Sequence, residues 1–368
     1  MNRFLPISRA DMEERGWETL DFVFISGDAY VDHPSFGPAI LCRLLEKHGY
    51  RVGIIPQPDW HSTRDFARLG RPRLAFLVSA GNMDSLLNQF TAAKKRRHED
   101  AYSPGGEGGH RPARATIVYA NRLRELYPEV PIIIGGIEAS LRRFAHYDYW
   151  SDEVRRSILV DSMADLLVYG MGERALLEIA ADLHQGVAVE NIQDVAGTCF
   201  RVPGFDYVYD YLKLPSFAAV RAEKRAFAEA FRTAYLEQDP IRGRRLAQQN
   251  DEWCVVQNPP AKPLTETEMD EVYDLPYQRT YHPIYEKAGG VPAIKEVQFS
   301  LVSQRGCFGG CNFCAIISHE GRIIQRRSHA SILREARLLT QLPGFKGYIH
   351  DVGGPTANFR RTSCDAQL

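Results

Sequence analysis

Residues 20–56 read LDFVFISGDAYVDHPSFGPAILCRLLEKHGYRVGIIP, and this stretch decides the fold class. Its two ends, Leu20–Ser26 and Arg51–Pro56, are short apolar runs of the kind that form buried strands. Between them, apolar residues recur with helical spacing over about Pro38–His48, and Gly49 stands where a C-cap glycine is expected. Strand, helix and strand in this order predict two parallel strands joined by a crossover helix.

The same alternation continues through the first half of the chain. Further strands are predicted at Leu74–Ser79, Pro131–Gly135 and Asp165–Tyr169, and helices at Ala115–Tyr127 and Glu173–His184. We therefore expect an α/β fold whose N-terminal domain is a doubly wound parallel sheet with helices on both faces.

A long segment without helical or strand periodicity, Lys94–Arg114, interrupts this pattern. It holds the basic run Lys94–Arg97 and then the glycine-rich sequence YSPGGEGG, a composition that cannot build a core. Long loops of this kind are often functional, but a plain solvated surface loop is the favoured interpretation.

The second half of the chain begins with a predicted helix over Phe217–Gln238, followed by a proline-rich connector. Beyond it we expect a strand at Glu296–Ser303, a helix at about Ser331–Leu342 and a strand at Gly347–Val352. The expected divisions are an N-terminal α/β domain over 1–215, the helix and connector over 216–290, and a third unit over 291–368.

Composition excludes several classes of protein. The 368 residues carry 45 Lys+Arg against 46 Asp+Glu, so there is no global field to attract nucleic acid, and the basic clusters Lys94–Arg97, Arg242–Arg245 and Arg360–Arg361 are interpreted as solvated loops. No stretch approaches the roughly 18 apolar residues of a membrane span. Met1–Trp17 lacks the apolar core of a signal peptide. We expect a cytoplasmic protein that binds neither membrane nor nucleic acid.

Three of the seven cysteines crowd into the loop CFGGCNFC as Cys307, Cys311 and Cys314. On a helix this spacing would form a buried stripe of small residues, but Gly306, Gly309 and Gly310 favour an irregular, wrapping backbone. Three thiolates on such a loop indicate a metal site. Zinc remains one alternative, with His319 as a fourth ligand; an iron-sulfur cluster with one open iron is the other.

Several motifs together resemble the radical S-adenosylmethionine (radical SAM) superfamily, and its YgiQ-type members in particular. They are RGCFGGCNFCA from Arg305, DVGGPTAN from Asp351, HPSFG from His33 and SAGNMDS from Ser79. The resemblance implies that residues 291–368 open a partial (β/α) barrel, and that the N-terminal domain is similar to cobalamin-binding domains.

The resemblance also implies the chemistry. A 4Fe-4S cluster on Cys307, Cys311 and Cys314 would bind S-adenosylmethionine at its open iron and, with an electron from a flavodoxin- or ferredoxin-type reductant, cleave it to a 5'-deoxyadenosyl radical. The substrate is not named by any motif.

Four further residues would bind S-adenosylmethionine on this resemblance. Phe313 is the aromatic residue before the last cysteine, and Gly353 and Gly354 match a Gly-Gly element that binds the methionine amino group. Pro355 replaces the usual acidic residue after them, so Asp351 becomes the candidate acceptor for that amino group.

Two motifs of the N-terminal domain have plainer interpretations. Asp32 adjoins His33, which departs from the Asp-x-His spacing of cobalamin-ligating loops; we therefore expect no cobalamin and interpret His33 as a loop residue that caps a helix. The glycines of GMGERA, from Gly170, formally fit a dinucleotide fingerprint, but a tight strand-to-helix turn is favoured. A nucleotide-binding interaction domain remains the rival function.

The last residues suggest that the chain stops early. A complete barrel takes about 250 residues, while only 73 remain from Glu296. We expect Leu368 to be a truncation, Cys364 to be a ligand or partner thiol that has lost its mates or a solvent-facing cysteine, and this chain alone to show weak radical chemistry or none.

Overall fold

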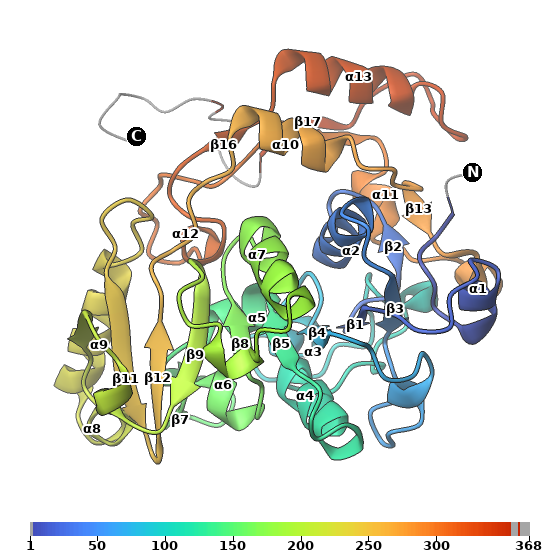
Figure 1. The fold of residues 1–368 in the computed structure, drawn as a ribbon. Coiled ribbons are helices and arrows are strands. Elements are labelled where there is room, and N and C mark those ends of the chain that lie inside the picture. The colour runs from blue at the N-terminus through green and yellow to red at the C-terminus, as the bar shows by residue number, and fades with distance from the viewer. Residues whose placement is uncertain (1–2, 355–359, 361–368) are drawn as a thin grey trace.

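The computed structural model describes residues 3–354 and residue 360, and its centre is a nine-stranded sheet (Figure 1). Five parallel strands form one side of it, in the spatial order β3-β1-β4-β5-β8. These are β1 (Phe22–Ser26), β3 (Val52–Pro56), β4 (Ala75–Ser79), β5 (Ile132–Gly135) and β8 (Leu166–Val168). All five predicted strands of the first half are confirmed.

The other side of the sheet makes it mixed rather than wholly parallel, so that part of the prediction is wrong. Here β9 (Thr198–Val202) pairs antiparallel with β8, and β12 (Trp253–Gln257) pairs antiparallel with β9. The sheet ends with β11 (Arg245–Asn250) and β10 (Tyr211–Lys213). Strands β11 and β12 lie within 216–290, where only a helix and a connector were predicted. Leu246 and Ala247 of β11 and Cys254, Val255 and Val256 of β12 are fully buried, which explains why both strands join the sheet.

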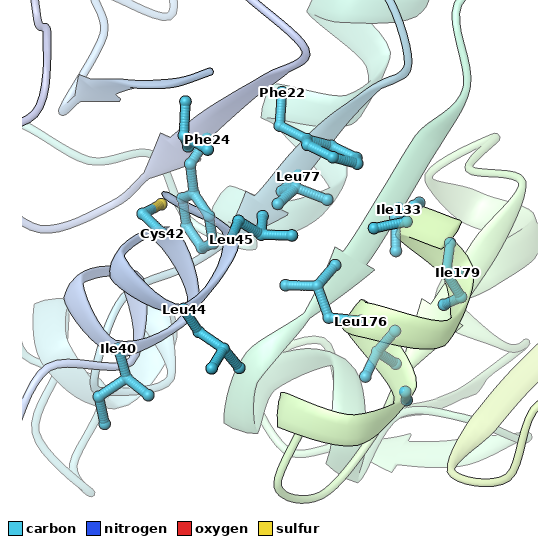
Figure 2. Close-up of a cluster of buried hydrophobic side chains, with 14 of the residues drawn as sticks. Phe22, Phe24, Ile40, Cys42, Leu44, Leu45, Leu77, Ile133, Leu176 and Ile179 are labelled. Carbon is cyan, nitrogen blue, oxygen red and sulfur yellow. The ribbon is translucent and has the colours of Figure 1, made fainter. Parts of the chain in front are cut away.

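The parallel strands are buried on both faces, which is why they read as continuous apolar runs. On one face, Phe22 and Phe24 of β1 pack against α2 (Gly37–Lys47) and α7 (Glu173–His184), as Figure 2 shows. On the other face, Val23 and Ile25 pack with α4 (Ala115–Leu126), α5 (Gly136–Leu141) and α6 (Ile158–Asp161). The predicted helices of this domain are therefore confirmed, and Gly49, at φ +85°, takes the left-handed conformation expected after α2.

The predicted long helix over Phe217–Gln238 is divided in two. Glu223 is extended, with φ −131° and ψ 123°, and separates α8 (Phe217–Ala222) from α9 (Lys224–Leu236). Both parts of the predicted segment are helical, and the break between them occurs where the sequence has neither Gly nor Pro.

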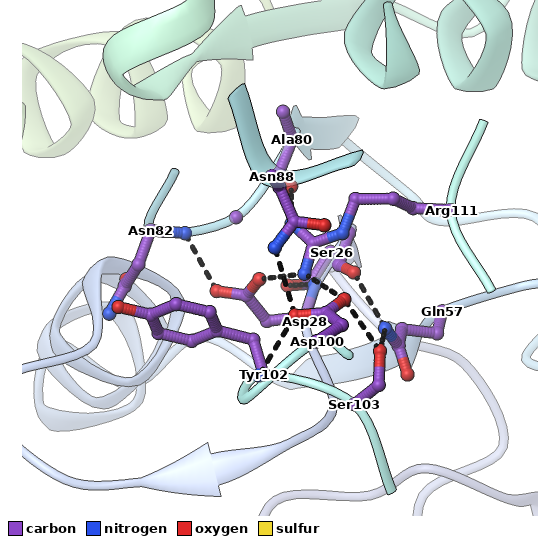
Figure 3. A network of polar contacts seen from close by, with 12 residues as sticks. Ser26, Asp28, Gln57, Ala80, Asn82, Asn88, Asp100, Tyr102, Ser103 and Arg111 are labelled. Carbon is purple, nitrogen blue, oxygen red and sulfur yellow. Dashed lines mark hydrogen bonds and ion pairs between the residues drawn. The ribbon is translucent and has the colours of Figure 1, made fainter. Parts of the chain in front are cut away.

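The segment 94–114 is not a plain solvated loop, and that prediction is wrong. Its own residues Asp100, Ser103 and Arg111 are almost completely buried. Arg111 Nη2 lies 2.9 Å from Asp28 Oδ1 and 3.0 Å from Asp100 Oδ2, so one guanidinium joins the segment to the end of β1 (Figure 3). Burial raises the pKa of Asp28 to about 6, whereas Arg111 and hydrogen bonds hold the pKa of Asp100 below its usual value against the effect of burial.

Residues 278–285 run back across the N-terminal domain. There β13 (Thr280–Tyr281) pairs antiparallel with β2 (Val31–Asp32), and Tyr30 N donates to the Tyr285 hydroxyl at 3.1 Å. The Asp32 carboxylate accepts from Gln278 N and forms a buried ion pair with Arg43 of α2. This segment is part of the same core as the sheet.

The last described part lies over one edge of the sheet, drawn in orange to red in Figure 1. Its elements are α10 (Glu266–Tyr273), α11 (Ile294–Val297), β14 (Ser300–Val302), β15 (Gln304–Arg305), α12 (Ile316–His319), β16 (Gln325–Arg326), α13 (His329–Leu339) and β17 (Asp351–Gly353). Strands β14 and β17 are parallel, and α13 lies between them in the chain, so one β-α-β unit of the expected kind is present. The predicted strand Glu296–Ser303 is shorter than expected because α11 occupies its beginning.

Smaller elements include α1 (Arg9–Glu13), α3 (Ser85–Gln89), β6 (His146–Asp148) and β7 (Glu153–Arg155). Among the described helices, none combines the length and apolar character needed to cross a bilayer.

Candidate functional site

A cavity of about 800 Å³ lies between the carboxyl edge of the parallel strands and the segment 296–354. On the sheet side it is lined by the turns after β4, β5 and β8 and by the beginning of α2. On the other side it is lined by residues of β14, β15, α12 and β17. Ligands of open α/β sheets bind at this edge, so the cavity is the first place to look for a site.

Glycine is required where two of these turns line the cavity. Gly136 has φ +81°, and a Cβ there would lie 2.6 Å from Ser79 Oγ. Gly81 has φ +106°, and a Cβ there would lie 2.1 Å from a carboxylate oxygen of Asp28. The cavity wall is therefore bare backbone at these points, which lets a ligand approach closely.

The cysteine loop follows β15 and is closed at its base by two hydrogen bonds. Gly306 N donates to Glu320 Oε2 at 2.9 Å, and Cys307 N donates to Gly321 O at 3.1 Å. Gly306 has φ +83°, and a Cβ there would lie 2.3 Å from Ile323 O, so no other residue fits. Burial raises the pKa of Glu320, although its bond to Gly306 N opposes the shift.

The three loop cysteines are free thiols. Cys311 is exposed, whereas Cys307 and Cys314 are partly buried. Gly309 N donates to Cys307 Sγ at 3.3 Å, and a Cβ on Gly309 would lie 3.3 Å from Cys307 Sγ and 3.7 Å from Cys311 Sγ. The backbone thus bends around a space bordered by two sulfurs, with an amide that already donates to one of them. Free thiols and amide donors on a wrapping loop are the donor set that an iron-sulfur cluster takes, so the residues fit that group.

The alternative zinc set is not assembled in this structure. Among residues 3–354 and 360, no three His, Cys, Asp or Glu side chains, the three loop cysteines included, converge closely enough to hold one metal ion. His319 instead places Nδ1 3.0 Å from Ser140 Oγ of α5. Burial lowers the pKa of His319 to about 4, so the imidazole is neutral and tied to the N-terminal domain.

The other described cysteines belong to the core. Cys42, Cys199 and Cys254 are fully buried. Burial raises the pKa of Cys199 to about 12 and that of Cys254 to about 11, and it raises the pKa of Cys42 far above its usual value. These thiols stay protonated and offer no ligand.

An ion pair that sequence reasoning missed joins the cysteine loop to the N-terminal domain. Arg305, two residues before Cys307, pairs through Nη1 with Glu173 at the first turn of α7, and its Nε donates to the Tyr273 hydroxyl at 3.2 Å. Arg305 and Glu173 are 6% and 4% exposed, and both line the cavity. Burial alone would lower the pKa of Arg305, but Glu173 and Tyr273 raise it above its ordinary value.

The remaining predicted site residues fall into two groups. Asp351, Gly353 and Gly354 line the cavity at and just beyond β17; Asp351 is exposed, and a Cβ on Gly354 would lie 2.6 Å from Gln304 Cγ. Phe313, by contrast, is 92% exposed on the outside of the loop. Pro355 and Cys364 lie outside the described residues.

His33 is a buried loop residue, but the prediction that it caps a helix is wrong, because the N-cap of α2 is Phe36 and no side chain caps that helix. His33 Nδ1 instead accepts from Ser35 N at 3.2 Å in the turn before α2, and burial lowers the pKa of His33 to about 3. Its Nε2 is buried and, among the described residues, has no hydrogen-bond partner. Gly170 has φ +75° in the tight turn from β8 to α7, and a Cβ there would lie 3.2 Å from His319 O.

Comparison with known families now decides the affiliation. Residues 4–300 match the model of the radical SAM N-terminal family. The chain belongs to this family. The class of radical SAM proteins predicted from the cysteine loop is thereby confirmed, by a match that ends at residue 300 and lies wholly before that loop.

Two curated relatives extend the match to the whole chain. It is 57% identical over 364 residues to a UPF0313 protein of Clostridium botulinum (strain ATCC 19397 / Type A), covering 99% of this chain and 56% of that protein. It is 58% identical over 368 residues to a UPF0313 protein of Clostridium perfringens (strain 13 / Type A), again covering 56% of the relative. The chain therefore spans about half the length of the curated relatives it matches.

Among solved structures, the chain resembles the radical SAM methyltransferase TsrM from Kitasatospora setae. The structure with tryptophan and the SAM analogue aza-SAM gives a TM-score of 0.47 at 16% identity, covering 91% of this chain and 47% of that one. The structure with cobalamin and a 4Fe-4S cluster gives 0.42 at 14% identity, covering 91% and 48%. At these scores the likeness says nothing about ligands of this chain, and the expectation of no cobalamin has no support from it.

Proposed function

We propose that Cys307, Cys311 and Cys314 hold a 4Fe-4S cluster and that the adjoining cavity holds S-adenosylmethionine, in a YgiQ-type radical SAM protein. The observation that carries the proposal is the loop itself: three free thiols on a backbone closed at its base by Glu320 and Gly321. Arg305 and Ile316, just before and after the loop, both line the cavity, whereas residues 306–315 do not, so the two ends of the loop lie at the cavity wall.

When bound, the cluster would supply the electron that cleaves S-adenosylmethionine to methionine and a 5'-deoxyadenosyl radical. The protein's part is to orient the substrate and to exclude water. The Gly309 amide stabilises thiolate charge on Cys307, because it already donates to that sulfur.

The charges beside the loop suit a cation. Glu296, Glu320 and Asp351 line the cavity, and Arg305, whose charge is already paired with Glu173, is the one Lys or Arg among its described lining residues. An acidic wall of this kind attracts a sulfonium and an ammonium group. Asp351 serves as the acceptor for the methionine amino group, beside the backbone of Gly353 and Gly354.

The outer side of the loop suits an electron donor. Cys311 is exposed and Phe313 is 92% exposed, so a flavodoxin- or ferredoxin-type protein reaches this face without entering the cavity. Because the chain covers 56% of its curated relatives, we propose that it loads the cluster but cleaves S-adenosylmethionine weakly by itself. A longer form that includes the further residues of such relatives, assayed beside it with dithionite, would release 5'-deoxyadenosine faster; equal rates would contradict this.

Anaerobic reconstitution with iron and sulfide tests the central proposal. We expect about four irons per chain, and loss of the bound iron when Cys307, Cys311 or Cys314 is replaced by Ala. Cys42→Ala, Cys199→Ala and Cys254→Ala are matched controls, since these thiols are buried in the core. Full iron retention in Cys311→Ala would overturn the assignment.

A further inference from the structure

The wall of the cavity consists of two chemically different halves. The half formed by the N-terminal domain, here called the sheet-edge wall, is apolar side chains, glycine turns and neutral polar groups. Its members include Leu41, Leu77, Ile137, Val168 and Leu176. Among the described residues that form it, Glu173 is the one with a charge, and it is paired with Arg305. The opposite half carries Glu296, Arg305, Glu320 and Asp351.

The sheet topology independently marks the same place. Numbered along the chain, the five parallel strands lie in the order 2-1-3-4-5, so the connections from β1 and β4 leave toward opposite faces of the sheet. Ligands of sheets with this order bind outside the carboxyl ends of the strands, where the order reverses. Ser79, Gly81 and Asn82, which end β4 and follow it, line the cavity at this point.

The charge pattern decides the class of ligand. Among the residues that the structure describes, no Lys or Arg lies on the sheet-edge wall, and the opposite half is acidic, so a phosphorylated or otherwise anionic ligand would be buried without a cationic side chain beside it. Two of the neutral side chains present already make hydrogen bonds: Ser79 Oγ accepts from Gly81 N, and Asn82 Nδ2 donates to Ser35 O. What the wall offers is apolar contact.

We propose that the sheet-edge wall binds a second small molecule that is uncharged and largely apolar. About 800 Å³ is near the upper end of the roughly 300–1,000 Å³ of small-molecule sites, so this molecule fits beside S-adenosylmethionine. Its binding depends only on the N-terminal domain. Its role, as the substrate from which the radical abstracts hydrogen, rests on the proposed function.

Two probes with the same ring system test the chemistry. N-phenyl-1-naphthylamine is neutral, and 8-anilinonaphthalene-1-sulfonate carries one negative charge on an equivalent skeleton. Both brighten in apolar surroundings, so fluorescence titration of the full chain gives a dissociation constant for each. We expect saturable binding of the neutral probe, at least about tenfold tighter than that of the sulfonate. Equal or tighter binding of the sulfonate would overturn the proposal.

Paired substitutions locate the binding. Leu41→Arg and Ile137→Arg each place a charge on the sheet-edge wall from a partly buried position. Each is expected to weaken the binding of the neutral probe about tenfold or more. Leu177→Arg is the matched control, because Leu177 is a partly buried helix residue that does not line the cavity. The affinity of Leu177→Arg for the neutral probe should equal that of the wild type. Wild-type affinity for the probe in both Leu41→Arg and Ile137→Arg would show that the probe does not bind at the sheet-edge wall.

The titration is separable from the proposed function. It is repeated on protein with Cys307, Cys311 and Cys314 all replaced by Ser, where cluster loading is abolished and probe affinity should persist. A failure to load iron would therefore leave the probe-binding result valid, and a failure to bind the probe would leave the iron-loading result valid. In the reconstituted wild-type protein, saturating S-adenosylmethionine should leave the probe bound, whereas full displacement would mean a single shared site and overturn the proposal.

Discussion

The Arg305 guanidinium pairs with the Glu173 carboxylate, and this buried contact joins residues 132 positions apart in the chain. Arg305 stands two residues before the first loop cysteine, and Glu173 begins α7 of the N-terminal domain. The position of the cysteine loop is therefore fixed against the sheet and not only by its own local hydrogen bonds.

Removing either partner of this pair should destabilise the protein strongly. Glu173→Ala or Arg305→Ala leaves a buried charge without compensation, which costs about 3–5 kcal/mol in free energy of unfolding, measured by denaturant titration. The double variant Glu173→Leu/Arg305→Met should recover part of that loss. Arg326→Ala is the control, because its pair with Glu266 is about half exposed and contributes at most about 1 kcal/mol. Additive losses in the double variant would argue against the pairing.

Glu320 should control how well the cysteine loop retains iron. Its carboxylate accepts from Gly306 N, so Glu320→Ala frees the base of the loop, and we expect iron content after reconstitution and desalting to fall at least twofold. Glu320→Gln keeps an acceptor oxygen at the same place and should behave like the wild type. Equal iron retention in Glu320→Ala and Glu320→Gln would show that the hydrogen bond does not matter.

The buried carboxyl of Asp28 should make stability fall as pH rises from about 4 to 6. Burial raises the pKa of Asp28 to about 6 from an ordinary value of 3.8, so the folded state binds a proton in this window that the unfolded state has lost. The associated stabilisation is complete below pH 4 and is lost as pH passes 6; it amounts to about 3 kcal/mol at most. Asp28→Asn should flatten this part of the stability profile, while the exposed Glu18→Gln should leave it as in the wild type. A profile unchanged by Asp28→Asn would contradict the assignment.

Exposure should sort the thiols by reactivity in iron-free protein. Under native, anaerobic conditions iodoacetamide should modify Cys311 first, then Cys307 and Cys314, and should leave Cys42, Cys199 and Cys254 unmodified, as read by peptide mass spectrometry. Cluster loading should protect all three loop thiols. Rapid alkylation of Cys199 would mean that the sheet opens in solution.

In air, the visible absorption of the loaded protein should bleach within hours, because an open iron reacts with oxygen.

Sequence patterns identified the parallel strands because each is buried on both faces and so is continuously apolar. The same reasoning missed β11, whose sequence RLAQQN is polar although Gln248 and Asn250 are fully buried. Gln248 Oε1 accepts from Ala145 N, and Asn250 Oδ1 accepts from Ser157 N, so these amides satisfy loop backbone rather than solvent. Hydropathy carries no signal for such residues.

The candidate site divides in the same way. The spacing of the loop cysteines and the Gly353–Gly354 pair could be read directly, since neighbouring residues carry them. The closure of the loop by Glu320, the Arg305–Glu173 pair and the apolar sheet-edge wall depend on segments far apart in the chain meeting at one edge. One sequence by itself does not show which distant segments contact each other in the fold.

The return of residues 278–285 onto β2 has a consequence for how the chain folds. The backbone N–H groups of Gln278 and Arg279 donate to Asp32, and Tyr30 N donates to the Tyr285 hydroxyl. These partners lie about 250 residues downstream in the chain. On the ribosome, the separate two-stranded sheet of β2 and β13 therefore cannot form until residues 280–281 have been synthesised, and such distant contacts slow folding. The cysteine loop is synthesised shortly after residues 278–285. Its thiols are therefore exposed to solvent at about the time when the segment 278–285 packs onto β2.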